Sequence, residues 1–328
     1  MKGKYTVKVS NNRVAYTLEL ERNITILTGE SGIGKTALAR LIQNFEDAGR
    51  QSGVTVQCKV PCRSITSDDG WESRLNAIHN SIIFIDEGRK FLQTKSFAET
   101  VAGNDNYFVL ITRESLSQIP YSVRSILTLK NTKRIGSKHY SRTYERFDFI
   151  SHFSDAVSNS EYLLTEDSNA GFEAYEKLTE GTSCVCISAK GKSNIPRVMM
   201  KYGNQRLLIV ADGAAFGSEM SKVYKYYQER PDDVTLFLPE SFEWLVLRSG
   251  IVSDRNLNSI LKKPWNYILS EKYMSWELYF TDLLKKITAE TKLQYSKTKL
   301  TKGYLTQSNI RKLKEAIERE DTLHETEK

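Results

Sequence analysis

The chain has 328 residues, of which 40% are hydrophobic and 27% are charged, and its formal net charge is +7. This length favours two domains over one hydrophobic core, and the composition is typical of a soluble globular protein. No apolar run reaches the roughly 18 residues that a membrane span needs, and the start, MKGKYTVKVS, lacks the apolar core of a signal peptide, so we expect a cytoplasmic protein without membrane contact.

The first half of the chain alternates short apolar runs with amphipathic segments. Residues 4–9 and 14–20 alternate apolar and polar side chains around Asn11-Asn12, which predicts a β-hairpin. The further predicted elements are strands at 23–28, 54–58, 82–85 and 107–111, helices at 35–45, 71–79 and 97–101, and a β-rich stretch at 126–150. Alternating strands and helices predict an α/β domain with a mainly parallel sheet over residues 1–150.

The pattern pauses and then restarts in the second half. Residues 151–160, SHFSDAVSNS, are small and polar, which predicts a linker. A second βαβ series with its own sheet is predicted over 161–245, with strands at 162–165, 184–188, 207–211 and 234–238 and helices at 171–178, 195–202 and 219–229. Residues 246–328 are predicted to form a helical, basic C-terminal region.

A glycine-rich loop follows the buried strand at 23–28. The eight residues Gly29-Glu30-Ser31-Gly32-Ile33-Gly34-Lys35-Thr36 fit the pattern G-x-x-x-x-G-K-[ST] at every position. Glycines let such a loop point its backbone N–H groups at phosphate, at the N-terminus of the next helix. Lys35 is then expected to reach the terminal phosphates of ATP and Thr36 to bind Mg²⁺.

Two further strand ends supply polar groups. The run Ile82–Ile85 leads into Asp86, expected beside the Mg²⁺, and Glu87, expected to polarise the attacking water. The run 107–111 leads into Thr112, a candidate sensor of the terminal phosphate. Arg113 follows, and it is a candidate to contact phosphate or a neighbouring subunit, with a purely structural role equally open.

These residues resemble the P-loop NTPases, with adjacent Walker A and Walker B elements in one sheet. The hairpin and the Asp-Glu pair are similar to the ABC or AAA-type branch. The chain lacks an S-G-G-Q-like signature and has only about 50 residues between the two motifs, so the resemblance implies a reduced ATPase of this kind. It also implies a homo-oligomer, because such ATPases often complete their site across a subunit contact.

Carboxylates follow the strands of the second half. Glu166 and Asp167 end the strand at 162–165, and Asp212 ends the strand at 207–211 before Gly213-Ala214-Ala215-Phe216-Gly217. Strand-end carboxylates are ligands that Mg²⁺ prefers. Asp212 is therefore a candidate metal ligand, and the alternative is that it caps the following turn.

In order, these residues resemble the Toprim domain of primases, topoisomerases and overcoming-lysogenisation-defect nucleases. Glu166 matches the family's Glu, Asp212 the first Asp and Gly217 the Gly, but Ala214 occupies the position of the second Asp. A two-metal site needs more anionic ligands than these. A third acid is expected from Glu243, Glu240 or Asp167. The alternative is that Ala214 marks a domain that binds a partner without cleaving it.

Two basic stretches have no place in these motifs. Residues 285–315 carry nine Lys or Arg, among them Lys297, and residues 130–146 carry Lys130, Lys133, Arg134, Lys138, Arg142 and Arg146 with two interleaved tyrosines. They suit a polyanion partner, or they are solvated surfaces. Cys58 and Cys62 lack a second pair at zinc spacing and are interpreted as buried thiols.

Together these patterns predict an ATPase that uses ATP and Mg²⁺ to gate an activity on DNA or RNA, with Lys35, Glu87, Glu166 and Asp212 as catalytic residues. The fusion resembles ATPase–nucleases of phage defence. One alternative is an ATP-dependent switch without nuclease activity, whose second domain binds a protein or nucleic acid. A third hypothesis is a nucleotide or small-molecule kinase. Against it, the sequence after Glu87 shows no cluster of arginines of the kind that forms a kinase lid.

Overall fold

The computed structural model describes residues 1–147 and 153–326, with the side chains of the last helix described up to Arg319. The chain is α/β and divides into two compact units. The first unit contains Met1–Phe147 and also Lys263–Ser275, and the second contains the remaining described residues. None of the described helices is both long and apolar enough to cross a bilayer.

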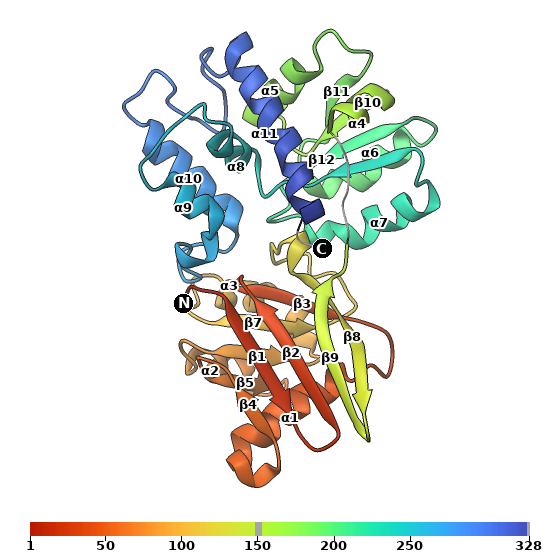
Figure 1. The fold of residues 1–328 in the computed structure, drawn as a ribbon, viewed down its shortest axis with the longest axis vertical. Helices are drawn as coiled ribbons and strands as arrows, with labels where there is room; N and C mark the ends of the chain where they lie inside the picture. Colours follow the sequence, from red (N-terminus) through yellow and green to blue (C-terminus); the bar gives the residue numbers. More distant parts are fainter. Residues whose placement is uncertain (148–152, 327–328) are drawn as a thin grey trace. The chain divides into compact units, whose positions relative to one another are not determined.

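The first unit contains a mixed nine-stranded sheet in the order β4-β1-β2-β9-β8-β3-β7-β6-β5. The strands β3 (Ile24–Thr28), β5 (Cys62–Ile65), β6 (Ile82–Ile85), β7 (Tyr107–Ile111) and the start of β8 (Ile126–Ile135) run parallel to their neighbours. The strands β1 (Tyr5–Ser10), β2 (Val14–Leu20), β4 (Thr55–Gln57) and β9 (Lys138–Glu145) form its other half (Figure 1).

The predicted N-terminal hairpin is confirmed, since β1 and β2 pair antiparallel with Val7 opposite Leu18 and Val9 opposite Tyr16. These four side chains are buried in one core cluster with Leu38 and Ile42 of helix α1 (Lys35–Ala48). The alternation of the hairpin therefore gives β1 and β2 one buried face, against α1, and one face turned away from that core.

The remaining elements of the first unit are short. They are the helices α2 (Trp71–Asn76) and α3 (Lys95–Val101) and the 3₁₀ turns η1 (Gly49–Ser52), η2 (Lys90–Gln93) and η3 (Val123–Ser125). Strand β5 was not predicted. It carries only four residues, and it is identified as a strand by its parallel pairing with β6.

A segment from late in the sequence completes the first unit. Residues 263–275, which include η6 (Pro264–Asn266), bond to the residues before β1 through Gly3 N–H to Trp265 O at 2.8 Å and Ser270 N–H to Met1 O at 2.9 Å. Asn23 Nδ2 donates to Met274 O at 3.0 Å. The prediction of one separate region over 246–328 is therefore wrong for this segment, because its backbone groups bond to residues of the first unit that precede β1 and β3.

The second unit contains a four-stranded, fully parallel sheet in the order β11-β10-β12-β13. Its strands are β10 (Tyr162–Thr165), β11 (Val185–Ser188), β12 (Leu207–Val210) and β13 (Val234–Phe237), close to the predicted positions. The helices α5 (Ala170–Thr179), α6 (Ile195–Lys201) and α7 (Met220–Glu229) connect them, with the 3₁₀ turns η4 (Lys192–Asn194) and η5 (Gly217–Glu219). The second βαβ series is thus confirmed as a separate sheet.

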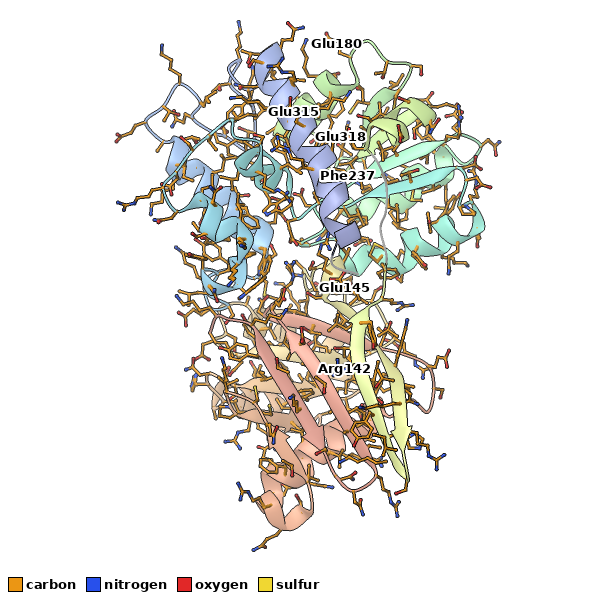
Figure 2. The ribbon with its side chains drawn as sticks, viewed as in Figure 1. Arg142, Glu145, Glu180, Phe237, Glu315 and Glu318 are labelled. Atoms are coloured by element: carbon orange, nitrogen blue, oxygen red, sulfur yellow. The ribbon has the colours of Figure 1, made fainter. Side chains whose placement is uncertain are left out.

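The helices of the C-terminal part also belong to the second unit. They are α8 (Phe242–Arg248), α9 (Leu257–Lys262), α10 (Trp276–Thr288) and α11 (Gln307–Thr326). Glu318 of α11, labelled in Figure 2, accepts a hydrogen bond from Ser154 N–H. This bond measures 3.1 Å, and the Ser154 hydroxyl donates a second one.

Ser154 lies in the segment predicted as a linker. Residues 148–152 lie outside the described residues, but Phe153–Asn159 forms helix α4. Its Phe153 is buried, with its ring centroid 5.1 Å from that of Phe237. The linker prediction at 151–160 is therefore wrong for these residues, because three apolar side chains in a polar-looking run are enough to dock a short helix on the sheet.

Candidate functional site

The glycine-rich loop lies between β3 and α1, as its sequence predicts. Gly29, Gly32 and Gly34 have φ angles of 141°, 79° and 100°, which side chains with a Cβ rarely adopt. A Cβ on Gly34 would lie only 2.5 Å from Tyr16 Oη, whose hydroxyl donates to Gly34 O at 3.1 Å. Glycine at 34 is thus required both by the backbone angle and by the close approach of β2.

Lys35 and Thr36 begin α1 and point to two different partners. The Lys35 ammonium donates to Gly29 O at 2.8 Å and to Glu30 O at 2.9 Å, so it lies across the loop. Burial, and then the positive charge of Arg113, lower the pKa of Lys35. The Thr36 hydroxyl donates to Asp86 Oδ1 at 3.4 Å, which brings the loop and the end of β6 together.

The loop strand and the Asp86 strand are not neighbours in the sheet. Strand β7 lies between β3 and β6 and runs parallel to both, so the carboxyl ends of all three strands meet at one edge. The edge on which the loop opens therefore also carries Asp86, Glu87, Thr112 and Arg113. The sequence predicts the common edge, but the strand order comes only from the pairing.

Glu87 and Arg113 face each other at this edge. Arg113 Nε lies 3.8 Å from Glu87 Oε2, and both side chains are about half exposed. They line a pocket of about 600 Å³ together with Thr112 and Glu114. The Thr112 hydroxyl accepts from Glu114 N–H at 3.0 Å, so the structure gives it a part in a local turn. Its predicted role as a phosphate sensor stays a prediction.

This edge has the chemistry to hold a phosphate chain and a divalent cation. The loop supplies glycine N–H groups and the lysine ammonium at the N-terminus of a 14-residue helix. Thr36 and Asp86 offer a hydroxyl and a carboxylate within 3.4 Å of each other, which are oxygen ligands of the kind Mg²⁺ takes. The residues therefore fit a nucleoside triphosphate with Mg²⁺.

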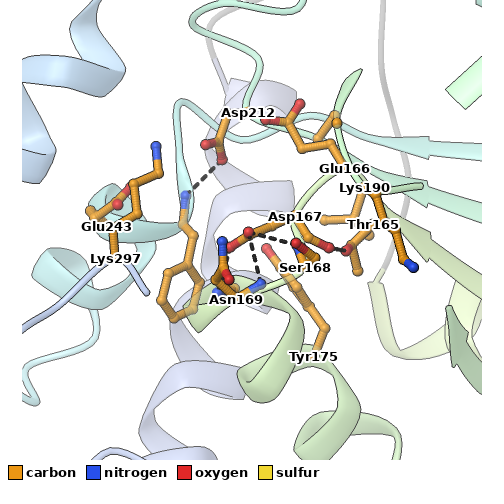
Figure 3. Close-up of a pocket in the computed structure, with 15 residues that line it drawn as sticks. Thr165, Glu166, Asp167, Ser168, Asn169, Tyr175, Lys190, Asp212, Glu243 and Lys297 are labelled. Carbon is orange, nitrogen blue, oxygen red and sulfur yellow. Dashed lines mark hydrogen bonds between the residues drawn. The ribbon is translucent and has the colours of Figure 1, made fainter. Parts of the chain in front are cut away.

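The second candidate site is a pocket of about 290 Å³ in the second unit. Glu166 follows β10 and Asp212 follows β12, and because these strands are adjacent and parallel, both residues stand at one sheet edge. Figure 3 shows Glu166, Asp212, Glu243 and Lys297 around this pocket. The sequence predicts that each of the two residues follows a strand, and the pairing of β10 with β12 is what brings them to one edge.

Asp212 also has a structural partner. Its Oδ1 accepts from Phe242 N–H, the first residue of α8, at 2.9 Å. Gly213 N–H donates to Pro239 O at 2.6 Å, and a Cβ at this glycine would lie 2.5 Å from Leu238 O. The backbone of residues 213–214 thus runs against 238–240, and buried Ala214 offers no oxygen to the pocket.

The candidates for a third acid differ in what they contact. Glu243 lines the pocket and is 1% exposed, and its Oε1 accepts from the Tyr295 hydroxyl at 2.8 Å. Glu240 is not among the residues that line the pocket. Asp167 lines it, but its carboxylate accepts from Ser168, Asn169 and Gly171 N–H groups at 2.7–2.9 Å, at the start of α5. Asp167 therefore serves mainly to stabilise the turn into α5.

Lys297 is a site residue that the sequence did not reveal. It lies in the basic stretch 285–315, whose side chains were expected on a surface, yet it lines the carboxylate pocket. Its ammonium lies 2.5 Å from Glu277 Oε1. Burial lowers the pKa of Lys297, but Glu277 and Glu243 raise it by more, so it stays charged. No local pattern signals this role, because the loop 289–306 has no regular periodicity.

The carboxylates of the pocket are held in an environment that disfavours their charge. Burial, followed by the negative charge of Glu277, raises the pKa of Glu166 to about 7. Burial, followed by the charge of Glu166, raises the pKa of Asp212 well above its usual value. The Oε2 atoms of Glu166 and of Glu243 are buried without a hydrogen-bond partner. Ionising these groups without a cation therefore costs free energy.

These residues fit one hydrated divalent cation better than two. Among the described residues, no three Asp, Glu, His or Cys side chains form a group that could hold a metal ion. Mg²⁺ commonly binds through one or two carboxylates and keeps several waters, which Glu166 and Asp212 can satisfy. A two-ion site lacks the anionic ligands to offset about four positive charges.

Comparison with protein-family models finds no matching family, and comparison with curated proteins finds no similar sequence.

Proposed function

We propose that the first unit binds ATP with Mg²⁺ and hydrolyses it, and that this hydrolysis gates an activity of the second unit on nucleic acid. The observation that carries the proposal is the contact of Thr36 with Asp86 at 3.4 Å, next to a lysine that lies across a glycine-rich loop. A hydroxyl and a carboxylate that come this close from two different elements are oxygen ligands that one Mg²⁺ can share with a bound phosphate.

The roles of the other residues follow from their positions. Lys35 exchanges its two carbonyl partners for phosphate oxygens, because a charge-assisted contact with phosphate is stronger than one with a neutral carbonyl. Glu87 orients the attacking water, and Arg113, 3.8 Å away, positions that carboxylate. Mg²⁺ supplies charge neutralisation on the phosphates when bound.

The second unit is proposed to act on phosphodiester bonds with a single Mg²⁺ held by Glu166 and Asp212. The support is their common edge and the unpartnered Glu166 Oε2. Lys297 adds a fixed positive charge near the same carboxylates. This charge favours the ionised forms of Glu166 and Asp212, but it does not replace the carboxylate ligand that Ala214 lacks.

The test is to incubate the protein with DNA and with RNA, with Mg²⁺ or Mn²⁺, with and without ATP. Lys35→Ala and Asp212→Asn are run in parallel, with the exposed Glu229→Gln as a matched control. We expect cleavage that needs metal, is lost in Asp212→Asn and loses its dependence on ATP in Lys35→Ala. Cleavage that persists in Asp212→Asn would overturn the assignment of the carboxylate pocket.

A second function has an observation in its favour. The absence, among the described residues, of a three-acid group supports an ATP-dependent switch whose second unit binds a protein or nucleic acid without cutting it. In that case the same incubations give no cleavage under any condition, while phosphate release shows ATP hydrolysis that Lys35→Ala abolishes.

A further inference from the structure

The hairpin of β8 and β9 carries a cationic face that neither proposed site uses. Residues 129–144 contain five Lys or Arg and no Asp or Glu. Lys130, Lys133 and Arg142 are exposed. Among the described residues, none of these three, nor Lys138, forms an ion pair with a carboxylate. A strand pair with this much uncompensated charge is suited to an anionic partner.

The strand register puts these side chains on one face. Successive side chains of a strand point to opposite faces, so Lys138, Tyr140, Arg142 and Tyr144 of β9 share one side. Lys130 is paired with Arg142 and, after a bulge, Lys133 with Tyr140. The ammonium groups of Lys130 and Lys133 lie 5.7 and 5.0 Å from the ring centroids of Tyr144 and Tyr140, which confirms the common face.

This face is turned away from the core of the first unit. Ser141, the neighbour of Tyr140 and Arg142, pairs with Tyr16 of β2, whose side chain belongs to the core cluster with α1. The residues next to Ser141 therefore project to the opposite side, over the part of the sheet where β1, β2, β9 and β8 lie side by side (Figure 1). Arg142 is labelled on β9 in Figure 2.

Two features of this face are unfavourable for the stability of the folded hairpin. Lys130 and Arg142 stand directly opposite each other, and like charges in such a pair destabilise the hairpin. Tyr144 keeps 45% of its surface exposed, and Ile135 near the turn keeps 59%. Interleaved cations and open aromatic rings are the features on which successive unpaired bases stack while their phosphates are neutralised.

We propose that this face, made of Lys130, Lys133, Lys138, Tyr140, Arg142 and Tyr144, binds single-stranded nucleic acid. The inference deepens the proposed function, because it places the nucleic-acid contact on the first unit. The hairpin itself passes the glycine-rich loop, since a Cβ on Gly29 would lie 3.1 Å from Leu129 O of β8.

The test is binding of a fluorescein-labelled single strand, as DNA and as RNA, measured by anisotropy at several salt concentrations. The buffer holds EDTA and no nucleotide, so the result does not depend on hydrolysis or cleavage. The variant combines Lys130→Gln, Lys133→Gln and Arg142→Gln. The matched control combines Arg40→Gln, Arg50→Gln and Lys59→Gln, three exposed cations elsewhere in the first unit.

We expect the hairpin variant to bind at least about tenfold more weakly, with the slope of log K against log salt reduced by about 2, as three lost phosphate contacts predict. Tyr144→Ala should weaken binding about tenfold and Tyr144→Phe should not, because phenylalanine keeps the stacking ring. The hairpin variant should fold at least as stably as the wild type, since it removes the Lys130–Arg142 repulsion.

Equal weakening in the hairpin variant and the control would overturn the inference. Duplex bound as tightly as single strand, with no effect of Tyr144→Ala, would also overturn it. So would a wild-type protein that binds vesicles of anionic lipid but no single-stranded nucleic acid. If the hairpin variant binds and cleaves nucleic acid like the wild type, the inference fails and the proposed function stands. If the hairpin binds a single strand but the protein cleaves nothing, the inference stands and the proposed nuclease activity fails.

Discussion

Replacing Glu166 by glutamine should stabilise the protein above neutral pH. The side chain is buried beside Asp212, and one carboxylate oxygen has no hydrogen-bond partner. Burial raises the pKa of Glu166 from 4.5 to about 7. The folded protein therefore holds a proton on this group more tightly than the unfolded chain does.

The magnitude follows from the linkage of protonation to folding. A group whose folded pKa is raised contributes stability that is fully present below about pH 4.5 and is lost as the pH rises through about 7. The difference between the folded and unfolded pKa values of Glu166 corresponds to about 3 kcal/mol of unfolding free energy at pH 8. Glutamine has the same shape and no charge to ionise, so Glu166→Gln should recover about this free energy at pH 8 and almost none at pH 4.5.

The assay is thermal and urea unfolding, followed by circular dichroism, at pH 4.5 and pH 8 with EDTA present. We expect the midpoint of the second unit to rise by about 5–10 °C at pH 8. Glu229→Gln, at an exposed position of α7, serves as the control and should shift the free energy by less than about 0.5 kcal/mol. A midpoint that is unchanged at pH 8, or a gain of equal size at both pH values, would refute the reasoning.

Three further predictions concern the first unit. Lys35→Ala should lower ATP hydrolysis about 100-fold or more, measured by phosphate release, because the loop loses its only ammonium group; a loss of less than about threefold would contradict the assignment. Gly34→Ala should lower the unfolding free energy by about 1–3 kcal/mol, because the residue has a φ of 100° and its Cβ would lie 2.5 Å from Tyr16 Oη. Tyr16→Phe should recover part of that loss, and no recovery would show that the backbone angle alone is responsible. Cys58 should react with iodoacetamide at pH 7 at least about tenfold faster than Cys184, since a hydrogen bond from Cys62 lowers the pKa of Cys58 to about 6 while burial raises that of Cys184 to about 11. Peptide mapping by mass spectrometry measures both rates, and equal labelling would contradict this prediction.

Most of the strands and helices, and the residues that end the strands, can be predicted from the sequence alone, with β5 and α4 among the exceptions. Glycines at 29, 32 and 34 predict the loop because few other residues adopt its backbone angles. Alternating and continuous apolar runs predict the hairpin, the buried strands β3, β6, β7, β10 and β12, and the polar residues that follow them. These features depend on neighbours within a few residues, which a single sequence displays.

The sequence does not predict which of these strand ends come together or which residues complete each site. The pairing placed β7 between β3 and β6, and burial brought Lys297 to the carboxylate pocket from 85 positions beyond Asp212. The Asp167 carboxylate accepts hydrogen bonds from the turn into α5, and residues 263–275 belong to the first unit. Such contacts are selected by burial and hydrogen bonding between distant segments, and these leave no periodic trace in the chain.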